Sequence, residues 1–239
     1  MGEHLQVRGD ALMVYVGIPT YNGLIHWTTV SGLIQSARYC GSEKIGFAVD
    51  VVPGDAFIGK ARNLLAHRFL KSGFRDLVFV DADVGFDLKG IERLCKAEPP
   101  IVMGLYQMKK PPPVRYPALM FDPLIRHPSD SNLIKMQYGP AGFMRVRKEV
   151  FEAMILKWPN DYYMASDNYA NAGPEKIYDF FPNGREGNHF TGEDLMFCKR
   201  AQECGFDIWA MQGIELKHSG EKCWESNWMV DVLELKEAV

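Results

Sequence analysis

Two aspartates stand one residue apart, directly after the short apolar run "LVFV" at residues 77–80. Asp81 and Asp83 repel each other when both are ionised, unless a positive group lies between them. Carboxylate oxygens are the ligands that hard cations such as Mg²⁺ and Mn²⁺ prefer, and such a cation can also hold a diphosphate. The alternative is an ordinary surface turn, where aspartate is common. The apolar run before the pair and the "VGF" after it favour a cation site.

Other common catalytic motifs are absent from the sequence. It contains no GxxxxGK[ST] phosphate loop, no GxGxxG after a predicted strand and no GxSxG nucleophile turn. Cys198, Cys204, His218 and Cys223 follow no common zinc-binding spacing. The two aspartates are therefore the strongest chemical signal in the chain.

Buried strands and amphipathic helices alternate along the first half of the chain. Predicted strands cover residues 12–18, 45–52, 77–80 and the run "PPIVMGLY". Predicted helices cover 59–74, which ends at Gly73, and a short segment after Asp87 as N-cap that buries Ile91, Leu94 and Cys95. This order predicts a parallel, twisted sheet with helices on both faces. Ligands of such sheets bind at the carboxyl ends of strands, where Pro19–Asn22 and Asp81–Asp83 fall.

The second half of the chain is less regular. The proline-rich run at 109–117 predicts an extended link, and residues 139–158 predict a glycine turn, a strand and a helix. Residues 158–192 are rich in Tyr, Phe, Asn and Gly, and we expect a loop there that closes over the site as a lid. "GEDLMFCKRAQECGF" predicts a helix that ends at Gly205, and "DIWAM" a last strand. We find no repeat and no boundary that divides the chain.

Composition narrows the class of protein. The 239 residues include 47% hydrophobic and 24% charged residues with a net charge of −3, which is ordinary for one globular domain and gives no overall basic field for nucleic acid. No apolar stretch is long enough to span a bilayer, and "MGEHLQVRGD" lacks the apolar core of a secretory signal. Five cysteines without a CxxC pair and the absence of N-x-S/T sequons predict a cytoplasmic location.

Four blocks of sequence carry a resemblance to a known family. "VGIPTYNG", "ARNLLAHRFLKSGFRDLVFVDADVGF", "GPAGFMRVRKEVFEAM" and "TGEDLMFCKRAQECGFDIWAMQGIELKHSG" resemble, in order, the blocks of a GT-A-fold nucleotide-sugar glycosyltransferase of the family 2-like group. The resemblance implies a single α/β domain with a Rossmann-type mixed, mainly parallel sheet flanked by helices. It also implies a nucleotide-binding part at 12–105, an acceptor-side part at 106–220 and a C-terminal tail at 221–239.

The same resemblance implies roles for particular residues. Residues matched to the donor site are Pro19, Thr20, Tyr21, Asn22, Arg62, Asn63 and Asp81. Asp81 and Asp83 match the D-x-D motif that binds Mn²⁺ or Mg²⁺, and His218 matches a late histidine that completes the metal shell in some members. In the Glu193-Asp194 pair, Asp194 matches the general base of inverting members. The implied reaction moves a sugar from a UDP- or GDP-sugar to a glycan or other hydroxyl acceptor.

One stretch departs from the family pattern. The aspartate-rich "DDGS" turn that holds the base is replaced by "VDVVPGDAFIGKARN", which leaves Asp50 and Asp55 as weaker candidates for contacts to the base. The identity of the donor therefore stays open. Lys109 and Lys110 are placed either to meet donor phosphates or simply to face solvent.

Several alternatives stay open from the sequence alone. Arg62 is equally consistent with a solvated helix position, and His218 with an ordinary buried histidine. Thr191-Gly192-Glu193-Asp194 also fits a helix capping box, in which Asp194 only reaches back to the helix N-terminus. At the level of function, the alternatives are a retaining transferase, a protein that binds nucleotide sugars without turnover, and a nucleotidyltransferase. The last normally needs a basic, Gly-rich loop that "IPTYNGLIHW" does not supply.

Overall fold

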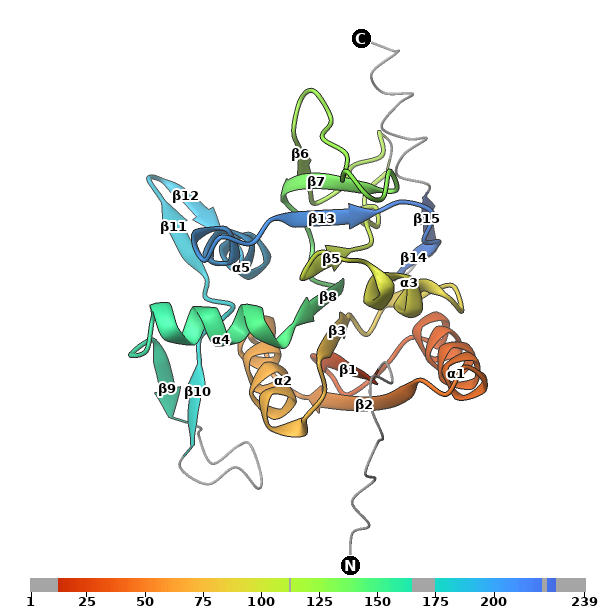
Figure 1. Cartoon of the computed structure of the whole chain (residues 1–239), viewed down its shortest axis with the longest axis horizontal. Coiled ribbons are helices and arrows are strands. Elements are labelled where there is room, and N and C mark those ends of the chain that lie inside the picture. Colours follow the sequence, from red (N-terminus) through yellow and green to blue (C-terminus); the bar gives the residue numbers. More distant parts are fainter. Residues whose placement is uncertain (1–12, 112, 165–174, 221–222, 227–239) are drawn as a thin grey trace, which may run out of the picture.

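An eight-stranded mixed sheet forms the centre of the protein (Figure 1). The computed structural model describes residues 13–111, 113–164, 175–220 and 223–226. In spatial order, the strands are β2 (Gly46–Pro53), β1 (Met13–Thr20), β3 (Asp76–Val80), β8 (Phe143–Arg147), β5 (Ile101–Met103), β13 (Ile208–Met211), β7 (Leu133–Tyr138) and β6 (Leu119–Met120). Within this sheet only β8 and β7 run against the other strands, so the expected mixed, mainly parallel α/β architecture is confirmed.

Strands β2, β1 and β3 bring their carboxyl ends to one edge of the sheet. Gly17 in β1 pairs with Asp50 in β2 and with Phe79 in β3, both in parallel register. Strand β8 is antiparallel to β3 and pairs Phe143 with Val80. The residue before β8 therefore lies beside the residue after β3, and the site is built on this adjacency.

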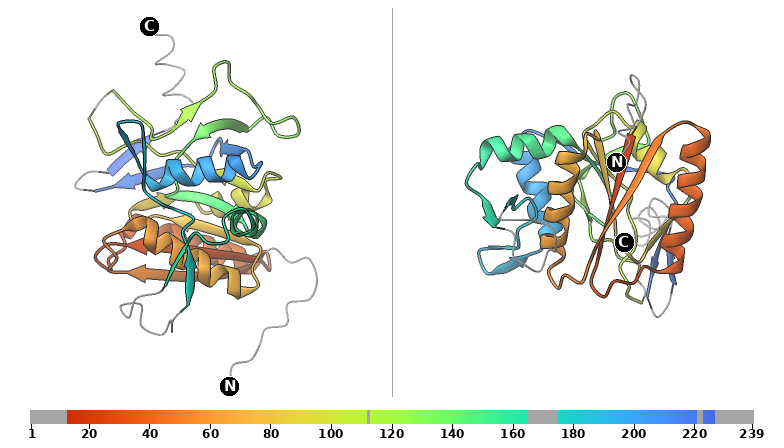
Figure 2. Two further views of the ribbon diagram at one scale, coloured as in Figure 1. Left: turned by 90° about the vertical axis from the view of Figure 1, so that its left-hand side faces the viewer. Right: turned by 90° about the horizontal axis from the view of Figure 1, so that it is seen from below.

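Helices cover both faces of the sheet (Figure 2). One face carries α1 (Trp27–Ser42) and α3 (Gly90–Lys96), and the other carries α2 (Ile58–Ser72), α4 (Lys148–Lys157) and α5 (Glu193–Glu203). Side chains alternate along β3: Val78 and Val80 face α3, whereas Leu77 and Phe79 face α2 and α4. Because both faces are covered, the central strands are apolar almost throughout, which explains their runs in the sequence.

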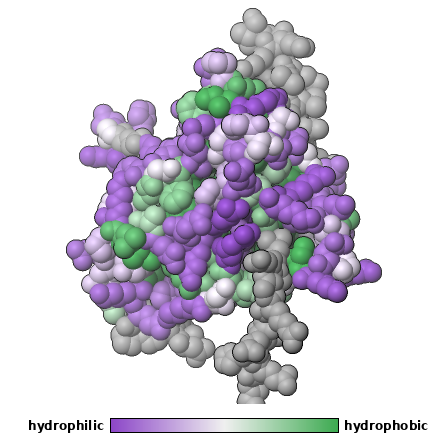
Figure 3. Space-filling model, viewed as in Figure 1, coloured by the Kyte–Doolittle hydropathy of each residue, from purple (hydrophilic) through white to green (hydrophobic). Residues whose placement is uncertain are grey.

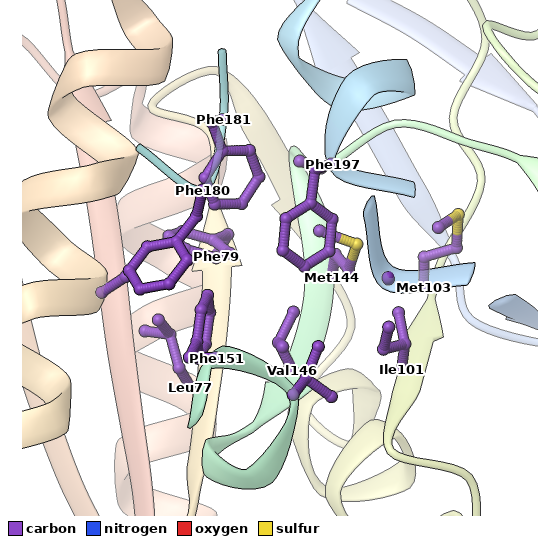
Figure 4. Packing of buried hydrophobic residues seen from close by; sticks show 14 of the residues in the cluster. Leu77, Phe79, Ile101, Met103, Met144, Val146, Phe151, Phe180, Phe181 and Phe197 are labelled. Carbon is purple, nitrogen blue, oxygen red and sulfur yellow. The ribbon is translucent and has the colours of Figure 1, made fainter. Parts of the chain in front are cut away.

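Aromatic rings fill the core between the sheet and helices α2, α4 and α5 (Figure 4). Phe181 stacks on Phe197 of α5 with ring centroids 4.4 Å apart, and Phe79 meets Phe181 edge-on at 5.2 Å. Phe151 of α4 packs against Phe180 at 4.9 Å. This packing anchors the segment that leads into α5, and so fixes where α5 begins.

Short strands outside the main sheet complete the fold. A three-stranded sheet contains β4 (Val84–Phe86), β14 (Leu216–Ser219) and β15 (Cys223–Ser226). Two hairpins, β9 (Tyr162–Met164) with β10 (Lys176–Tyr178) and β11 (Gly184–Glu186) with β12 (His189–Thr191), lie in the segment predicted as an irregular loop. Residues 165–174 of that predicted lid, and all of the predicted tail at 221–239 except β15, lie outside the described residues.

One predicted helix start was wrong. Asp87 does not cap α3, whose N-cap is Lys89. The Asp87 carboxylate instead accepts hydrogen bonds from the backbone N–H groups of Lys89 (2.9 Å) and Glu215 (3.0 Å). It therefore ties the turn before α3 to the segment before β14. The helix itself buries Ile91, Leu94 and Cys95, as expected.

The surface shown in Figure 3 is mainly hydrophilic, with apolar residues in separate small patches. No helix among the described residues is long and apolar enough to cross a membrane. Both observations agree with the composition of the chain.

Candidate functional site

The turn that carries the two aspartates is held by three distant segments. The backbone N–H of Asp81 donates to the carbonyl of Gly142 at 2.8 Å. The carbonyl of Ala82 accepts from the N–H of His26, and that of Asp83 from the N–H of Ser219, both at 2.8 Å. The turn is therefore fixed by β8, by the start of α1 and by the end of β14. Its carboxylates have defined positions, unlike those of a free surface turn.

A cleft of about 590 Å³ opens at the carboxyl ends of β1 and β3. It is lined by Pro19, Thr20, Tyr21, Asn22, Leu24, Ile25, His26, Trp27, Ile58, Asp81, Ala82 and Asp83. The two strand ends singled out in the sequence thus meet in one cavity. The Thr20 hydroxyl donates to the carbonyl of Leu24 at 3.0 Å, and the Asn22 side chain accepts from the N–H of Leu24 at 3.0 Å, so both shape the loop. Tyr21 lies at the rim and is 75% exposed.

Arg62 lies behind the cleft and joins three carboxylates. The side chain is 1% exposed on α2, and its Nη2 bonds Asp81 Oδ1 at 2.8 Å. Its Nη1 bonds Glu193 Oε1 at 2.8 Å and Asp194 Oδ1 at 2.7 Å. A Cβ on Gly59, one turn earlier, would lie 2.4 Å from the carbonyl oxygen of Phe181 and 3.3 Å from the Cβ of Glu193, so glycine there lets α2 approach the start of α5. Close packing of the two helices places the guanidinium among the acids.

Arg62 faces three carboxylates, and burial together with these charges shifts the pKa of Asp194. Burial acts to lower the pKa of Arg62, but attraction to Asp81, Asp194 and Glu193 outweighs it and raises the value. Burial raises the pKa of Asp194 to about 7; Arg62 and the N–H of Ala141 oppose the shift, and the charges of Glu193 and Asp81 add to it. Asp194 is consequently poised to gain or lose a proton near neutral pH.

Tyr106 and Gly142 form the floor beside Asp81. A Cβ at Gly142 would lie 2.1 Å from the Tyr106 hydroxyl and 2.4 Å from Asp81 Oδ2, so only glycine leaves room for both groups. Burial raises the pKa of Tyr106 well above its usual value, and the charges of Asp81 and Asp194 act in the same direction. The phenol therefore stays protonated and remains a hydrogen-bond donor next to the carboxylates.

Asp83 faces the opposite way, toward His218 and Lys109. His218 Nδ1 lies 2.8 Å from the carbonyl of Gln107, to which it donates, and His218 Nε2 lies 3.7 Å from Asp83 Oδ1. Burial lowers the pKa of His218, although the Gln107 carbonyl and Asp83 oppose that shift. A neutral imidazole with its proton on Nδ1 presents the Nε2 lone pair to the Asp83 carboxylate. Lys109 Nζ forms an ion pair with the other oxygen, Oδ2.

This donor set fits a divalent cation in its chemistry. A carboxylate and an imidazole whose second nitrogen is bound to a carbonyl are typical metal ligands, and the Lys109 ammonium shows that a positive charge is accommodated at Asp83. No group of three or more His, Cys, Asp or Glu residues with metal-binding geometry occurs in the part of the chain that the structure describes. Asp81, the other predicted ligand, is bound to Arg62. Phosphate and water oxygens would have to supply the remaining ligands.

Three predicted donor-site residues do not line the cleft: Arg62, which lies behind it, Asp50 and Asn63. Asp50 accepts from the Tyr15 hydroxyl at 2.5 Å and pairs with Arg68 at 3.0 Å. Asn63 donates to Asp179 at 2.7 Å and accepts from the N–H of Phe181 at 3.0 Å, so it helps to fix the chain before α5.

The capping alternative for Asp194 does not describe this helix. The N-cap of α5 is Gly192, which forms no side-chain cap, and the Asp194 carboxylate bonds Arg62 instead. Sequence reasoning missed Tyr106 and Gly142 in the site. For Gly142 a signal existed, because it opens the strand in one of the blocks that carry the resemblance.

Known proteins resemble this chain in fold but not in sequence. No family model matches it, and no curated protein matches it. Among solved structures, that of GalNAc-T7 with UDP, GalNAc and Mn²⁺ is 11% identical, with a TM-score of 0.45 over 85% of this chain and 43% of that one. TarS of S. aureus in complex with UDP-GlcNAc is 13% identical, with a TM-score of 0.45 over 84% of this chain and 56% of that one. The chain thus spans about half the length of these two proteins.

A second class of enzyme also resembles the fold. A nucleoside-diphosphate-sugar pyrophosphorylase of Vibrio cholerae is 9% identical, with a TM-score of 0.38 over 84% of this chain and 91% of that one.

Proposed function

We propose that this protein is a cation-dependent glycosyltransferase that moves a sugar from a nucleotide-diphosphate donor to an acceptor hydroxyl. One observation carries the proposal. Arg62 joins Asp81, in the wall of the cleft, to Glu193 and Asp194 at the start of α5. The Arg62 guanidinium thus links a carboxylate on the donor side to a carboxylate poised for proton transfer, which supports a site where a donor and an acceptor meet.

The donor is proposed to lie across the strand ends. Its nucleotide would contact Thr20, Tyr21 and the backbone of Pro19 and Asn22, and its diphosphate would lie near Asp83. Asp83 and His218 would hold Mn²⁺ or Mg²⁺, which offsets the negative charge of the departing diphosphate. We assign no direct donor contact to Asp50 or Asn63, because their side chains are engaged elsewhere.

Asp194 is proposed as the general base. Oxygen Oδ1 is bound to Arg62, which orients the carboxylate and leaves Oδ2 to accept the proton of the acceptor hydroxyl. The acceptor oxygen then attacks the anomeric carbon, the bond from that carbon to the phosphate oxygen breaks, and its electron pair leaves with the diphosphate. This in-line displacement inverts the anomeric centre. Burial of Arg62 and its ion pair with Glu193 keep both side chains in place during the step.

The alternatives differ in a product that can be observed. A retaining transferase on the same fold would conserve the anomeric configuration, with Asp194 orienting the sugar. A binding protein would not hydrolyse the donor, and a nucleotidyltransferase would consume a sugar phosphate and a nucleoside triphosphate. Proton NMR of the products from UDP- and GDP-sugars with an acceptor, and in a second reaction from a sugar phosphate with a nucleoside triphosphate, distinguishes all four.

Calorimetric titration of UDP and GDP, with Mn²⁺ or with excess EDTA, tests the donor and cation together. We expect one nucleotide to bind at least about tenfold more tightly with Mn²⁺, and Asp83→Asn to abolish that difference. Asp207→Asn is the matched control, because Asp207 also pairs with a lysine, Lys135 at 2.7 Å, but on an exposed surface outside the cleft. Equal affinities with and without the cation would contradict the proposal.

A further inference from the structure

Asp83 already has a cationic partner supplied by the chain itself. Lys109 Nζ pairs with Asp83 Oδ2, while His218 Nε2 lies on the side of Oδ1. Both members of the ion pair remain partly accessible, with 33% of the lysine and 39% of the aspartate side chain exposed. The ammonium thus occupies the carboxylate to which the proposed divalent cation would bind, and it lies in contact with solvent, so it is free to leave.

Neighbouring backbone places Lys109 at that position. Gln107, two residues earlier, accepts the hydrogen bond from His218, and the N–H of Met108 donates to the carbonyl of Arg115 at 2.7 Å. On the other side, a Cβ at Gly220 would lie 3.2 Å from the Lys109 side chain, so this glycine leaves room for the lysine stem. Segments 107–109 and 218–220 therefore hold the ammonium, the imidazole and the carboxylate together as one unit.

We propose that Lys109 is an exchangeable counter-cation for Asp83. It neutralises the carboxylate while no divalent cation is bound, and it transfers to the diphosphate oxygens of the donor when the cation takes its place. This inference rests on the proposed function and adds a ligand for the donor. Lysine suits the exchange, because its compact charge on a flexible four-carbon stem binds phosphate without a fixed geometry.

The exchange couples the two ligands. A divalent cation that binds alone must displace the ammonium and leave it without a partner. A diphosphate that binds alone draws the ammonium away from Asp83. The negative charges of the diphosphate and of Asp83 then repel each other. When both ligands bind, every charge is paired, so each ligand increases the affinity for the other, by a factor that is equal in the two directions.

Binding of Mn²⁺ alone, followed by electron paramagnetic resonance of the free ion, tests the inference without turnover. We expect Lys109→Gln to bind Mn²⁺ about tenfold more tightly than the wild type, because a competing positive charge is removed from the carboxylate. In EDTA, whichever of UDP and GDP binds the wild type should bind Lys109→Gln at least about threefold more weakly. Lys109→Arg, which keeps the charge, should bind Mn²⁺ about as weakly as the wild type.

Lys110→Gln is the matched control, because Lys110 is an exposed lysine next to Lys109 and the substitution removes the same charge. An equal gain in Mn²⁺ affinity in both glutamine variants would indicate a general charge effect and overturn the inference. Unchanged or weaker Mn²⁺ binding by Lys109→Gln would overturn it as well. If Asp83→Asn removes Mn²⁺ binding while Lys109→Gln leaves it unchanged, only the counter-cation role fails. If Asp83→Asn binds Mn²⁺ as the wild type does, both the proposed cation site and the counter-cation role fail.

Discussion

Replacing Asp194 by Asn separates its roles in catalysis and in folding. The asparagine keeps the shape of the side chain and accepts hydrogen bonds from Arg62 and Ala141, but it neither carries a charge nor takes a proton. In the unfolded chain Asp194 titrates near 3.8, whereas in the folded protein burial raises its pKa to about 7. Between these values the folded protein holds a proton that the unfolded chain has lost. The contribution of Asp194 to stability therefore falls as the pH rises from about 4 to about 7.

The size of this effect follows from the shift. About three pKa units correspond to a ceiling of about 4 kcal/mol, at about 1.4 kcal/mol per unit. Because 32% of the Asp194 side chain is exposed, solvent screens the charge. We therefore expect the ionised side chain to lower the free energy of unfolding by about 1–2 kcal/mol. In a chain of this length each kcal/mol changes the melting temperature by about 2–4 °C. Asp194→Asn should therefore melt about 2–8 °C above the wild type at about pH 8, with the difference vanishing near pH 4.

Activity should respond in the opposite direction. Loss of a general base lowers the transfer rate by about 10²–10⁴-fold, while donor binding is retained. Melting curves of both proteins from about pH 4 to pH 8, with product formation at each pH, provide the two measurements. Normal turnover in Asp194→Asn would refute the base, and a lower melting temperature at about pH 8 would refute the reasoning on charge. Asp207→Asn, at an exposed ion pair, should show neither effect.

Three further outcomes are expected at neighbouring positions. His218→Ala should weaken Mn²⁺ binding more than Mg²⁺ binding, because imidazole suits the softer ion; an unchanged ratio in calorimetric titrations would favour a purely structural histidine. Arg62→Gln leaves three carboxylates facing each other without their guanidinium, so its urea midpoint should fall most steeply above about pH 7, and Arg62→Lys should restore part of the loss. Gly142→Ala should abolish nucleotide binding with Mn²⁺ in calorimetry, since its methyl group would displace Tyr106 and Asp81; retained affinity would show that the floor adjusts.

The fold was predictable where local signals are strong. Runs such as residues 77–80 form buried strands, and helices cover both faces of the sheet, as the order of elements predicted. That order predicted a parallel sheet, whereas β8 and β7 run antiparallel, and only the family resemblance implied a mixed sheet. The start of α3 was not predictable, because the Asp87 carboxylate has two competing backbone partners, one of which is Glu215, 128 residues away. Two hairpins in the segment 158–192 were also missed, since short strands of mixed composition resemble loops in sequence.

The chemistry of the site divides in the same way. The sequence by itself determined that acidic residues follow a buried strand, that a second strand end carries Pro19–Asn22, and that an acidic pair opens a late helix. These are local features, and parallel neighbouring strands bring the first two to one edge. Only the tertiary structure decided what each carboxylate contacts. Arg62 meets Glu193 and Asp194 across more than 130 residues of sequence, because α2 packs against α5. The sequence pattern of α2 does not decide whether Arg62 is buried or solvated. The packing of α2 against α5 buries it and makes its guanidinium the link between the donor cleft and the proposed base.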